Sequence, residues 1–260
     1  MTETSDLRGE IVALWRHPLK GFTPEPLMTV ALRPGEGLPL DRCWAVEHGP
    51  SGFDPAAPTH ISKFRFVALA PMPSAARVRT RLDDATGRLH AAADGAEDIS
   101  ADLTDPADAR RFTAWLTAVL GEAVEAPLKV TQAQGHRFFD HPQGLVSLTS
   151  LASLTALEAA MGAPLDPRRL RGNIEIAGWP AFAETDLRPG QRIRLGPLVA
   201  EVFKPIQRCV ATHVNPETAE ADVALVPALQ QLTGHANCGV YVHILEAGDV
   251  RVGDGAEVLA

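Results

Sequence analysis

Proline, glycine and polar clusters divide the first hundred residues into apolar segments that are too short for helices. The chain contains 21 glycines and 21 prolines. Short apolar runs bounded by such turn residues are typical of β-strands. They predict strands at 10–15, 27–32, 41–46, 64–69 and 76–82, a surface loop at 48–60, and Lys20 on the turn after the first strand.

Two later segments carry the spacing of helices. The first runs from Asp105-Pro106, a pair suited to a helix cap and to the first helical position, to Gly121. Its apolar residues recur at helical spacing and predict a face that packs on the core. The second helix is expected to begin at Thr149 or Ser150, either of which can cap it.

A chain of 260 residues can bury a large core in one domain or in two small ones. Residues 122–127 follow the first helix and read as a join between two halves. We therefore expect an N-terminal domain over residues 1–124 and a C-terminal domain over residues 125–260.

Charge and cysteine content exclude several classes of protein. The net charge is −8, which argues against a general nucleic-acid binder and leaves room for a local basic pocket. The three cysteines form no C-x-x-C pair, which disfavours a disulfide framework, a structural zinc site and an iron–sulfur cluster.

Targeting signals are also missing from the sequence. The N-terminus has no basic segment followed by an apolar core, and no run approaches the ~20 apolar residues of a membrane span. We therefore expect a cytoplasmic protein with no membrane span.

One cysteine stands among basic residues. Cys209 follows Lys204 and Arg208, directly after a strand-like run at 192–202. A neighbouring cation favours the thiolate, the form that attacks electrophiles and binds soft metals. The alternative is an inert cysteine packed at the end of a strand. The local sequence leaves both readings open.

Motifs for dinucleotide binding, P-loop phosphate binding, zinc proteolysis and serine hydrolysis are not found. Several basic residues are instead expected where a strand or helix ends, together with hydroxyl residues at the start of the second helix. Guanidinium donors and the free N–H groups of a helix N-terminus can bind a phosphate or another dianion. Taken singly, each basic residue can also be a solvated loop charge. The basic residues are Lys20, Arg42, Arg171, Lys204 and Arg208, and the hydroxyls are Thr149, Ser150 and Ser153.

Seven short motifs, in the same order along the chain, resemble those of the molybdenum cofactor sulfurase C-terminal (MOSC) superfamily. The resemblance is to the two-part type with an N-terminal β-barrel module, similar to the mitochondrial amidoxime-reducing component and its bacterial relatives. Any one motif is weak, whereas seven in order are specific. They are Trp15–Gly21, Gly37–Trp44, Ala114–Leu116, Thr149–Leu154, Leu170–Asn173, Arg208–Thr218 and Gly248–Asp254.

The resemblance implies a mainly β (α+β) protein: a β-barrel-like MOSC fold with an N-terminal β-barrel module and two main flanking helices. It also implies the molybdenum cofactor (molybdopterin with Mo), bound in a cleft between the two halves. In the family the cysteine of the R-C pair binds the metal, so Cys209 is the expected metal ligand and catalytic residue. The expected cofactor-binding residues are Lys20, Arg42, Thr149, Ser150, Arg171, Asn173, Gln207 and Arg208.

The implied function is an oxidoreductase that reduces N-hydroxylated (N–O or S–O) small molecules. Its electrons would come from a separate donor protein, ferredoxin-like or cytochrome b5-like with its reductase. The alternative is a non-catalytic carrier of the molybdenum cofactor, or of sulfur as a persulfide on Cys209. A third reading, a barrel protein that has lost the cofactor, rests on departures from the family pattern at Gly21 and Ile206.

Overall fold

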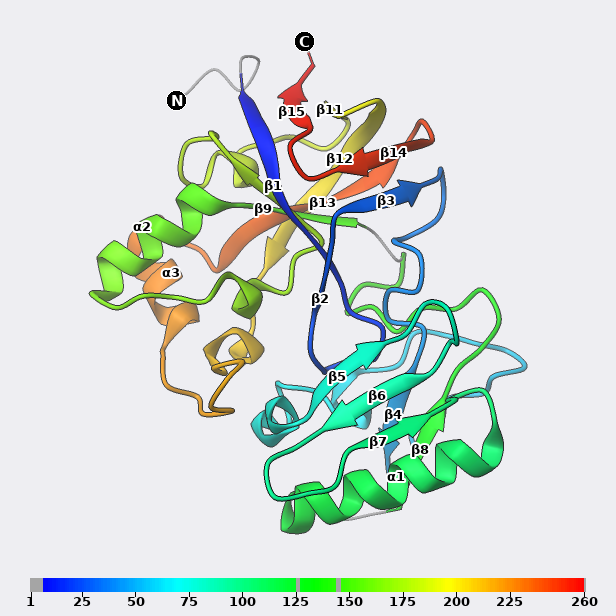
Figure 1. Ribbon diagram of the computed structural model, residues 1–260. Helices are drawn as coiled ribbons and strands as arrows, with labels where there is room; N and C mark the ends of the chain where they lie inside the picture. Colours follow the sequence, from blue (N-terminus) through cyan, green and yellow to red (C-terminus); the bar gives the residue numbers. More distant parts are fainter. Residues whose placement is uncertain (1–6, 125–126, 144–145, 260) are drawn as a thin grey trace.

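The protein was analysed as a computed structural model that describes residues 7–124, 127–143 and 146–259. Its centre is a closed barrel of seven strands, in which β10 pairs with both β9 and β1 (Figure 1). In order around the barrel the strands are β1 (Arg8–Arg16), β10 (Ile174–Ala177), β9 (Val146–Ser150), β13 (Asn237–Ile244), β12 (Leu198–Gln207), β11 (Arg192–Leu195) and β15 (Gly255–Val258).

The barrel closes because its strands present apolar side chains to a common interior. Ile11 and Leu14 of β1 are buried there beside Leu148, Ile193 and Val242 of other strands. Side chains on successive residues of a strand point to opposite faces, so alternate positions fill the interior. Strand β1 belongs to the predicted N-terminal half, whereas the other six barrel strands follow residue 145.

Strand β12 bends as it leaves the barrel. Its pairing with β13 shifts register between Val202 and Lys204 and again between Pro205 and Gln207. Such irregularities insert unpaired residues and turn a strand away from its partner. The bend places the residues after Gln207 outside the barrel, at one end.

Smaller sheets surround the barrel. Strand β2 (Glu25–Leu27) extends it beside β1, and β3 (Thr29–Leu32) pairs with β14 (Gly248–Arg251). The lower part of Figure 1 contains two more sheets and the helix α1 (Pro106–Leu120). These are the pair β4 (Ala45–His48) with β8 (Leu128–Thr131), and the sheet β5 (Arg79–Leu82), β6 (Leu89–Ala92) and β7 (Ile99–Ala101).

Helix α1 confirms the prediction from its sequence. The Asp105 carboxylate accepts hydrogen bonds from the N–H groups of Ala107 and Asp108, and Gly121 follows the last helical residue. Phe112 and Leu116 are fully buried in a second core beneath the three-stranded sheet.

Two further helices pack against each other beside the barrel. Helix α2 (Leu151–Met161) begins directly after β9, with Ser150 at the expected cap position but without a capping hydrogen bond from its hydroxyl, and Gly162 follows its last residue. Helix α3 (Leu225–Thr233) was not predicted; Leu225 and Leu229 face α2 in a third core. The structure confirms the expected mainly β, α+β, barrel-like fold and adds this helix.

Three strand predictions need correction. Residues Lys63–Arg65 form a 3-10 helix in place of a strand at 64–69, because the Ser62 hydroxyl caps that turn. A 3-10 helix at Pro73–Arg77 shortens the strand predicted at 76–82 to β5. The strand predicted at 41–46 starts only at Ala45, because Arg42 has a left-handed backbone with φ of 52°.

No helix in the described ranges is both long and apolar enough to cross a membrane.

Candidate functional site

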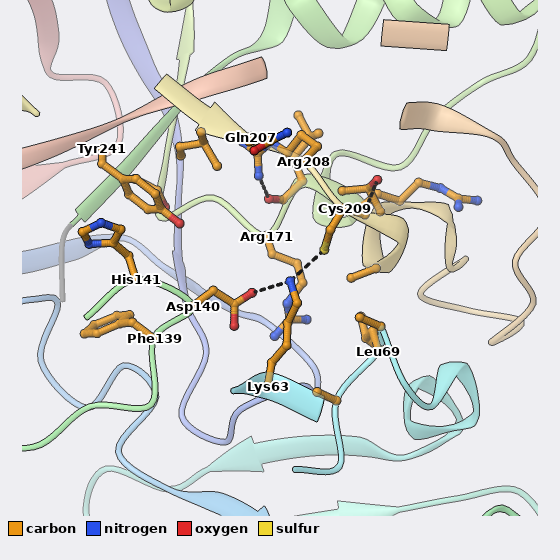
Figure 2. A pocket seen from close by; sticks show the side chains of 18 of the residues that line it. Lys63, Leu69, Phe139, Asp140, His141, Arg171, Gln207, Arg208, Cys209 and Tyr241 are labelled. Carbon is orange, nitrogen blue, oxygen red and sulfur yellow. Dashed lines mark hydrogen bonds and ion pairs between the residues drawn. The ribbon is translucent and has the colours of Figure 1, made fainter. Parts of the chain in front are cut away.

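A cavity of about 490 Å³ lies at the end of the barrel from which β12 emerges. Both predicted halves contribute to its walls, and Figure 2 shows side chains from each of them converging on it. The residues that line the cavity include Lys20, Gly21, Arg42, Lys63, Asp140, Ser147, Arg169, Arg171, Asn173, Lys204, Gln207, Arg208, Cys209, Thr212 and Tyr241.

The structure brings most of the predicted site residues to this one cavity. Seven of the nine line it: Lys20, Arg42, Arg171, Asn173, Gln207, Arg208 and Cys209. Thr149 and Ser150 do not line it, because they are the last two residues of β9 and both are buried. The Thr149 methyl group packs beneath Gly172 and Gly239, where it supports the cavity wall from behind.

Cys209 is held in a tight turn after β12. Its carbonyl accepts hydrogen bonds from both the N–H (3.0 Å) and the hydroxyl (2.9 Å) of Thr212. The N–H of Val226 donates to Nε2 of His213 at 3.1 Å and attaches this turn to helix α3. The backbone that carries the thiol is therefore fixed, while the side chain remains partly exposed in the cavity.

Lys63 is the nearest charged neighbour of the thiol. Its ammonium nitrogen lies 3.1 Å from Sγ of Cys209 and 3.5 Å from Oδ2 of Asp140. Burial lowers the pKa of Lys63, but Asp140 and Cys209 outweigh this effect and raise it above its ordinary value. Lys63 is thus a cation at neutral pH.

Lys20 binds the loop that carries Asp140. Its buried ammonium donates to the carbonyl oxygen of Phe138 at 2.9 Å and to Oδ1 of Asp140 at 2.5 Å. Burial lowers the pKa of Lys20, and Asp140 partly opposes that effect. Burial also raises the pKa of Asp140, but Lys20 and Lys63 reverse this and hold it well below its usual range.

Two arginines with left-handed backbone conformations line the cavity side by side. Arg42 has φ of 52° and Arg171 has φ of 51°. Arg42 forms an ion pair with Asp41 and donates to the Arg171 carbonyl at 3.2 Å. Burial, and then the charge of Arg42, lower the pKa of Arg171 to about 10. Two guanidinium groups this close repel each other unless an anion lies between them.

Arg208 and Asn173 serve mainly to hold backbone segments together. Arg208 donates to the carbonyls of Cys238 at 2.6 Å and Leu170 at 2.5 Å. Asn173 accepts from the Ser147 hydroxyl at 2.8 Å. Its amide donates to the Trp15 carbonyl at 3.1 Å and to Asp41 at 3.3 Å.

Two glycines keep this arrangement possible. Gly239 has φ of 86°, and a Cβ there would lie 2.6 Å from a guanidinium nitrogen of Arg208. Gly21, which replaces the family's serine, has φ of 87°, and a Cβ there would lie 2.6 Å from the backbone of Val67 and Ala68. Close backbone packing therefore explains Gly21 without reference to any ligand.

Five of the residues that line the cavity have no site role in the sequence analysis: Lys63, Asp140, His141, Arg169 and Tyr241. Asp140 and His141 lie in a polar loop and Tyr241 lies on an apolar strand, and neither pattern points to a site. Lys63 gave no signal at all, because its neighbours read as a strand and its partner Cys209 is 146 residues away. Arg169 was seen only as part of a basic turn; it is buried, and its Nε has no hydrogen-bond partner among the described residues.

The charge of the lining is opposite in sign to that of the chain. Seven lining residues are basic and one, Asp140, is acidic, although the whole chain carries a net charge of −8. A recess lined by one sign of charge concentrates ligands of the other sign. The donor set of lysines and forked guanidinium groups fits a phosphate-bearing cofactor.

A metal bound here would take one protein ligand. Within the described residues, no group of three or more His, Cys, Asp or Glu side chains could hold a metal ion. The thiolate of Cys209 is a soft ligand of the kind that binds a metal already held by a cofactor. The residues present therefore fit a cofactor that brings its own metal ligands.

Comparison with known proteins gives the family. Residues 8–128 match the MOSC N-terminal beta barrel domain, and residues 135–257 match the MOSC domain. The chain therefore belongs to the MOSC domain proteins that carry the N-terminal β-barrel domain. This family is associated with binding of the molybdenum cofactor, so we expect the site to serve that class of function.

Similar solved structures include YuaD of Bacillus subtilis, at 16% identity and a TM-score of 0.48, covering 97% of this chain and 96% of that one. YiiM of Geobacillus stearothermophilus is 20% identical with a TM-score of 0.34 and covers 44% of this chain and 54% of its own. YiiM of Escherichia coli is 16% identical with a TM-score of 0.33 and the same coverage. No curated protein sequence matches the chain. These similarities are too low to transfer residue roles.

Proposed function

We propose that this protein binds the molybdenum cofactor through Cys209 and reduces N-hydroxylated small molecules, with N–O or S–O bonds as the reacting groups. The observation that carries the proposal is the Cys209 thiol, which faces a cavity with seven basic lining residues and one acidic residue. A soft thiolate for the metal and cations for a phosphate are the two features that this cofactor requires.

The chain's own residues divide into three groups by position. Cys209 provides the metal ligand from the turn after β12. Arg42 and Arg171, which line the cavity next to each other, provide forked donors for the cofactor's phosphate. Lys20 positions the loop that carries Asp140 and closes one side of the cavity.

The bound cofactor would supply the oxidation and reduction chemistry, while the protein orients it and leaves a metal position open to substrate. Removal of oxygen from an N–O group consumes two electrons and two protons and releases water. Phe139, His141 and Tyr241 line the cavity near Asp140, on the side away from Cys209 in Figure 2, where a small organic substrate can pack.

Electrons are proposed to come from a separate donor protein of the ferredoxin or cytochrome b5 kind. Cys43 precedes β4, Cys209 follows β12 and Cys238 lies in β13, and all three thiols are free. Of the three, Cys209 alone lines the cavity, where it is proposed to bind the metal, and delivery of electrons is proposed for a separate protein.

Metal analysis with a matched thiol control tests the proposal. Protein expressed in a host that makes the cofactor should contain molybdenum in a 1:1 ratio, and Cys209→Ala should lose both metal and amidoxime reduction. Cys43→Ala removes a half-buried thiol outside the cavity and should retain both. Full activity of Cys209→Ala with a suitable reductase contradicts the proposal.

A second candidate is a carrier that holds sulfur as a persulfide on Cys209, and the 3.1 Å contact with the Lys63 ammonium favours it. The thiolate would attack the outer sulfur of a donor persulfide and release the donor's thiolate. Mass spectrometry after incubation with a cysteine desulfurase should then show the mass of one added sulfur on Cys209 alone. An unmodified Cys209 removes this candidate.

A further inference from the structure

Lys63 reaches the thiol from a part of the chain that the family motifs do not include. It lies on the short 3-10 helix Lys63–Arg65, which follows the loop after β4 and is capped by the Ser62 hydroxyl. Next to it, Phe66 is buried in a small core with Phe53 and Phe138. This packing joins residues of both predicted halves and fixes the helix, from which the lysine extends to the thiol of Cys209.

Two partners direct the ammonium group. Its nitrogen, which carries three N–H donors, lies 3.1 Å from Sγ of Cys209 and 3.5 Å from Oδ2 of Asp140. Figure 2 shows Lys63 between these two side chains. The other carboxylate oxygen of Asp140, Oδ1, lies 2.5 Å from the ammonium nitrogen of Lys20, and this ion pair fixes the position of Asp140.

The contact has a specific consequence for a metal bound to the sulfur. A hydrogen bond donated to a thiolate withdraws electron density from the metal–sulfur bond and stabilises the reduced form of the metal more than the oxidised form. Hydrogen bonds to ligand sulfurs are one of the means by which proteins set reduction potentials. The side chain of Lys63 is 24% exposed, so water screens the contact only in part.

We propose that Lys63 is a positioning residue that donates a hydrogen bond to the metal-bound sulfur of Cys209, with Asp140 as its anchor, and so raises the reduction potential of the bound metal. This inference rests on the proposed role of Cys209 as the metal ligand. It adds a residue that touches the ligand sulfur and assigns it an effect on the metal's electronic state.

Three variants separate a hydrogen bond from the general effect of charge. Lys63→Met removes the donor and its charge. Lys204→Met removes the same charge from another lysine of the cavity, one that has no hydrogen bond to the sulfur in the described part of the chain. Lys63→Arg retains a charged donor at the original position. The metal content and thermal unfolding of each cofactor-loaded protein are measured first, and its midpoint potential is then determined by a redox titration followed by electron paramagnetic resonance.

Lys63→Met is expected to shift the potential to a more negative value, by the equivalent of a tenfold change in the ratio of reduced to oxidised metal. For one electron this is about 59 mV. Lys204→Met should shift it less, and Lys63→Arg should recover part of the loss.

Equal shifts in the two methionine variants, or no shift in Lys63→Met, overturn the inference and leave the proposed function standing. A wild-type protein that takes up no metal refutes the proposed function, and this inference falls with it. Because Lys63 is partly exposed and Lys63→Arg keeps its charge, a folding defect in one variant does not prevent the comparison.

Discussion

Acidification from about pH 7 to about pH 5 is expected to remove about 2 kcal/mol of stability through one side chain, His17. The imidazole is completely buried, and both ring nitrogens lack a hydrogen-bond partner within the described residues. Its Nδ1 lies 3.4 Å from Oδ1 of Asp41. Burial, followed by the charges of Arg42 and Arg171, lowers the pKa of His17 to about 3.

The sign follows from which state binds the proton. In the unfolded chain His17 titrates near its ordinary pKa of about 6.5, whereas in the folded protein it stays neutral until about pH 3. Between these values the unfolded state holds one more proton, so stability is retained above about pH 6.5 and falls as the pH decreases through that window. Each pH unit inside the window contributes about 1.4 kcal/mol, and the part between about pH 7 and pH 5 amounts to about 2 kcal/mol.

Urea unfolding at the two pH values measures this loss in the wild type and in His17→Leu, which cannot take up the proton. The variant should lose about 2 kcal/mol less than the wild type on acidification. His90→Leu, which removes a histidine from strand β6 far from the cavity, controls for the loss of any histidine. If the wild type and His17→Leu lose the same stability, burial of a neutral His17 is the wrong explanation.

Three further variants test packing and charge. Glu25→Gln removes the buried carboxylate that lies 2.7 Å from the Arg16 guanidinium and leaves it, among the described residues, only the exposed Asp84 at 2.8 Å, so it should destabilise the protein by about 3 kcal/mol in urea unfolding; unchanged stability would show that Asp84 alone suffices for Arg16. Gly239→Ala should displace Arg208, lower the free energy of unfolding by about 2 kcal/mol and reduce the molybdenum content. A variant with full molybdenum content would contradict the proposed crowding. Leu116→Ala should lower the free energy of unfolding by about 2–5 kcal/mol, because it leaves a cavity under α1, and should leave the metal content unchanged. A loss below about 1 kcal/mol would mean that the core collapses to fill that cavity.

Local signals carried the parts of the prediction that succeeded. Asp105, Pro106 and Gly121 mark both ends of α1, because caps and helix stops depend on neighbouring residues alone. Cys209 stood out because the basic residues around it are adjacent in sequence. Arg42 and Arg171 were candidates because each was expected where a strand or helix ends, and the order of the family motifs then placed both of them with Cys209 in one site.

The parts that failed depend on contacts between distant residues. Lys63 reaches Cys209 only because the 3-10 helix is anchored by Phe66 in a core that includes Phe138 from another loop. Thr149 was assigned to the cofactor from its place in a motif, yet its side chain is buried behind the cavity wall. A motif fixes which residues occur together, while the direction of each side chain is decided by the packed structure.

Closure of the barrel by β1 has a consequence for how the protein is made. Residues Arg8–Glu10 pair with Gly255–Glu257, so the strand at residues 8–10 cannot complete its pairing before residues 255–257 have been synthesised. Pairings between such distant residues carry a large loop-closure entropy and form slowly. The cavity joins Lys20 to Cys209 across this closure, so a nascent chain that has not yet reached residue 257 would lack a finished site to receive the cofactor.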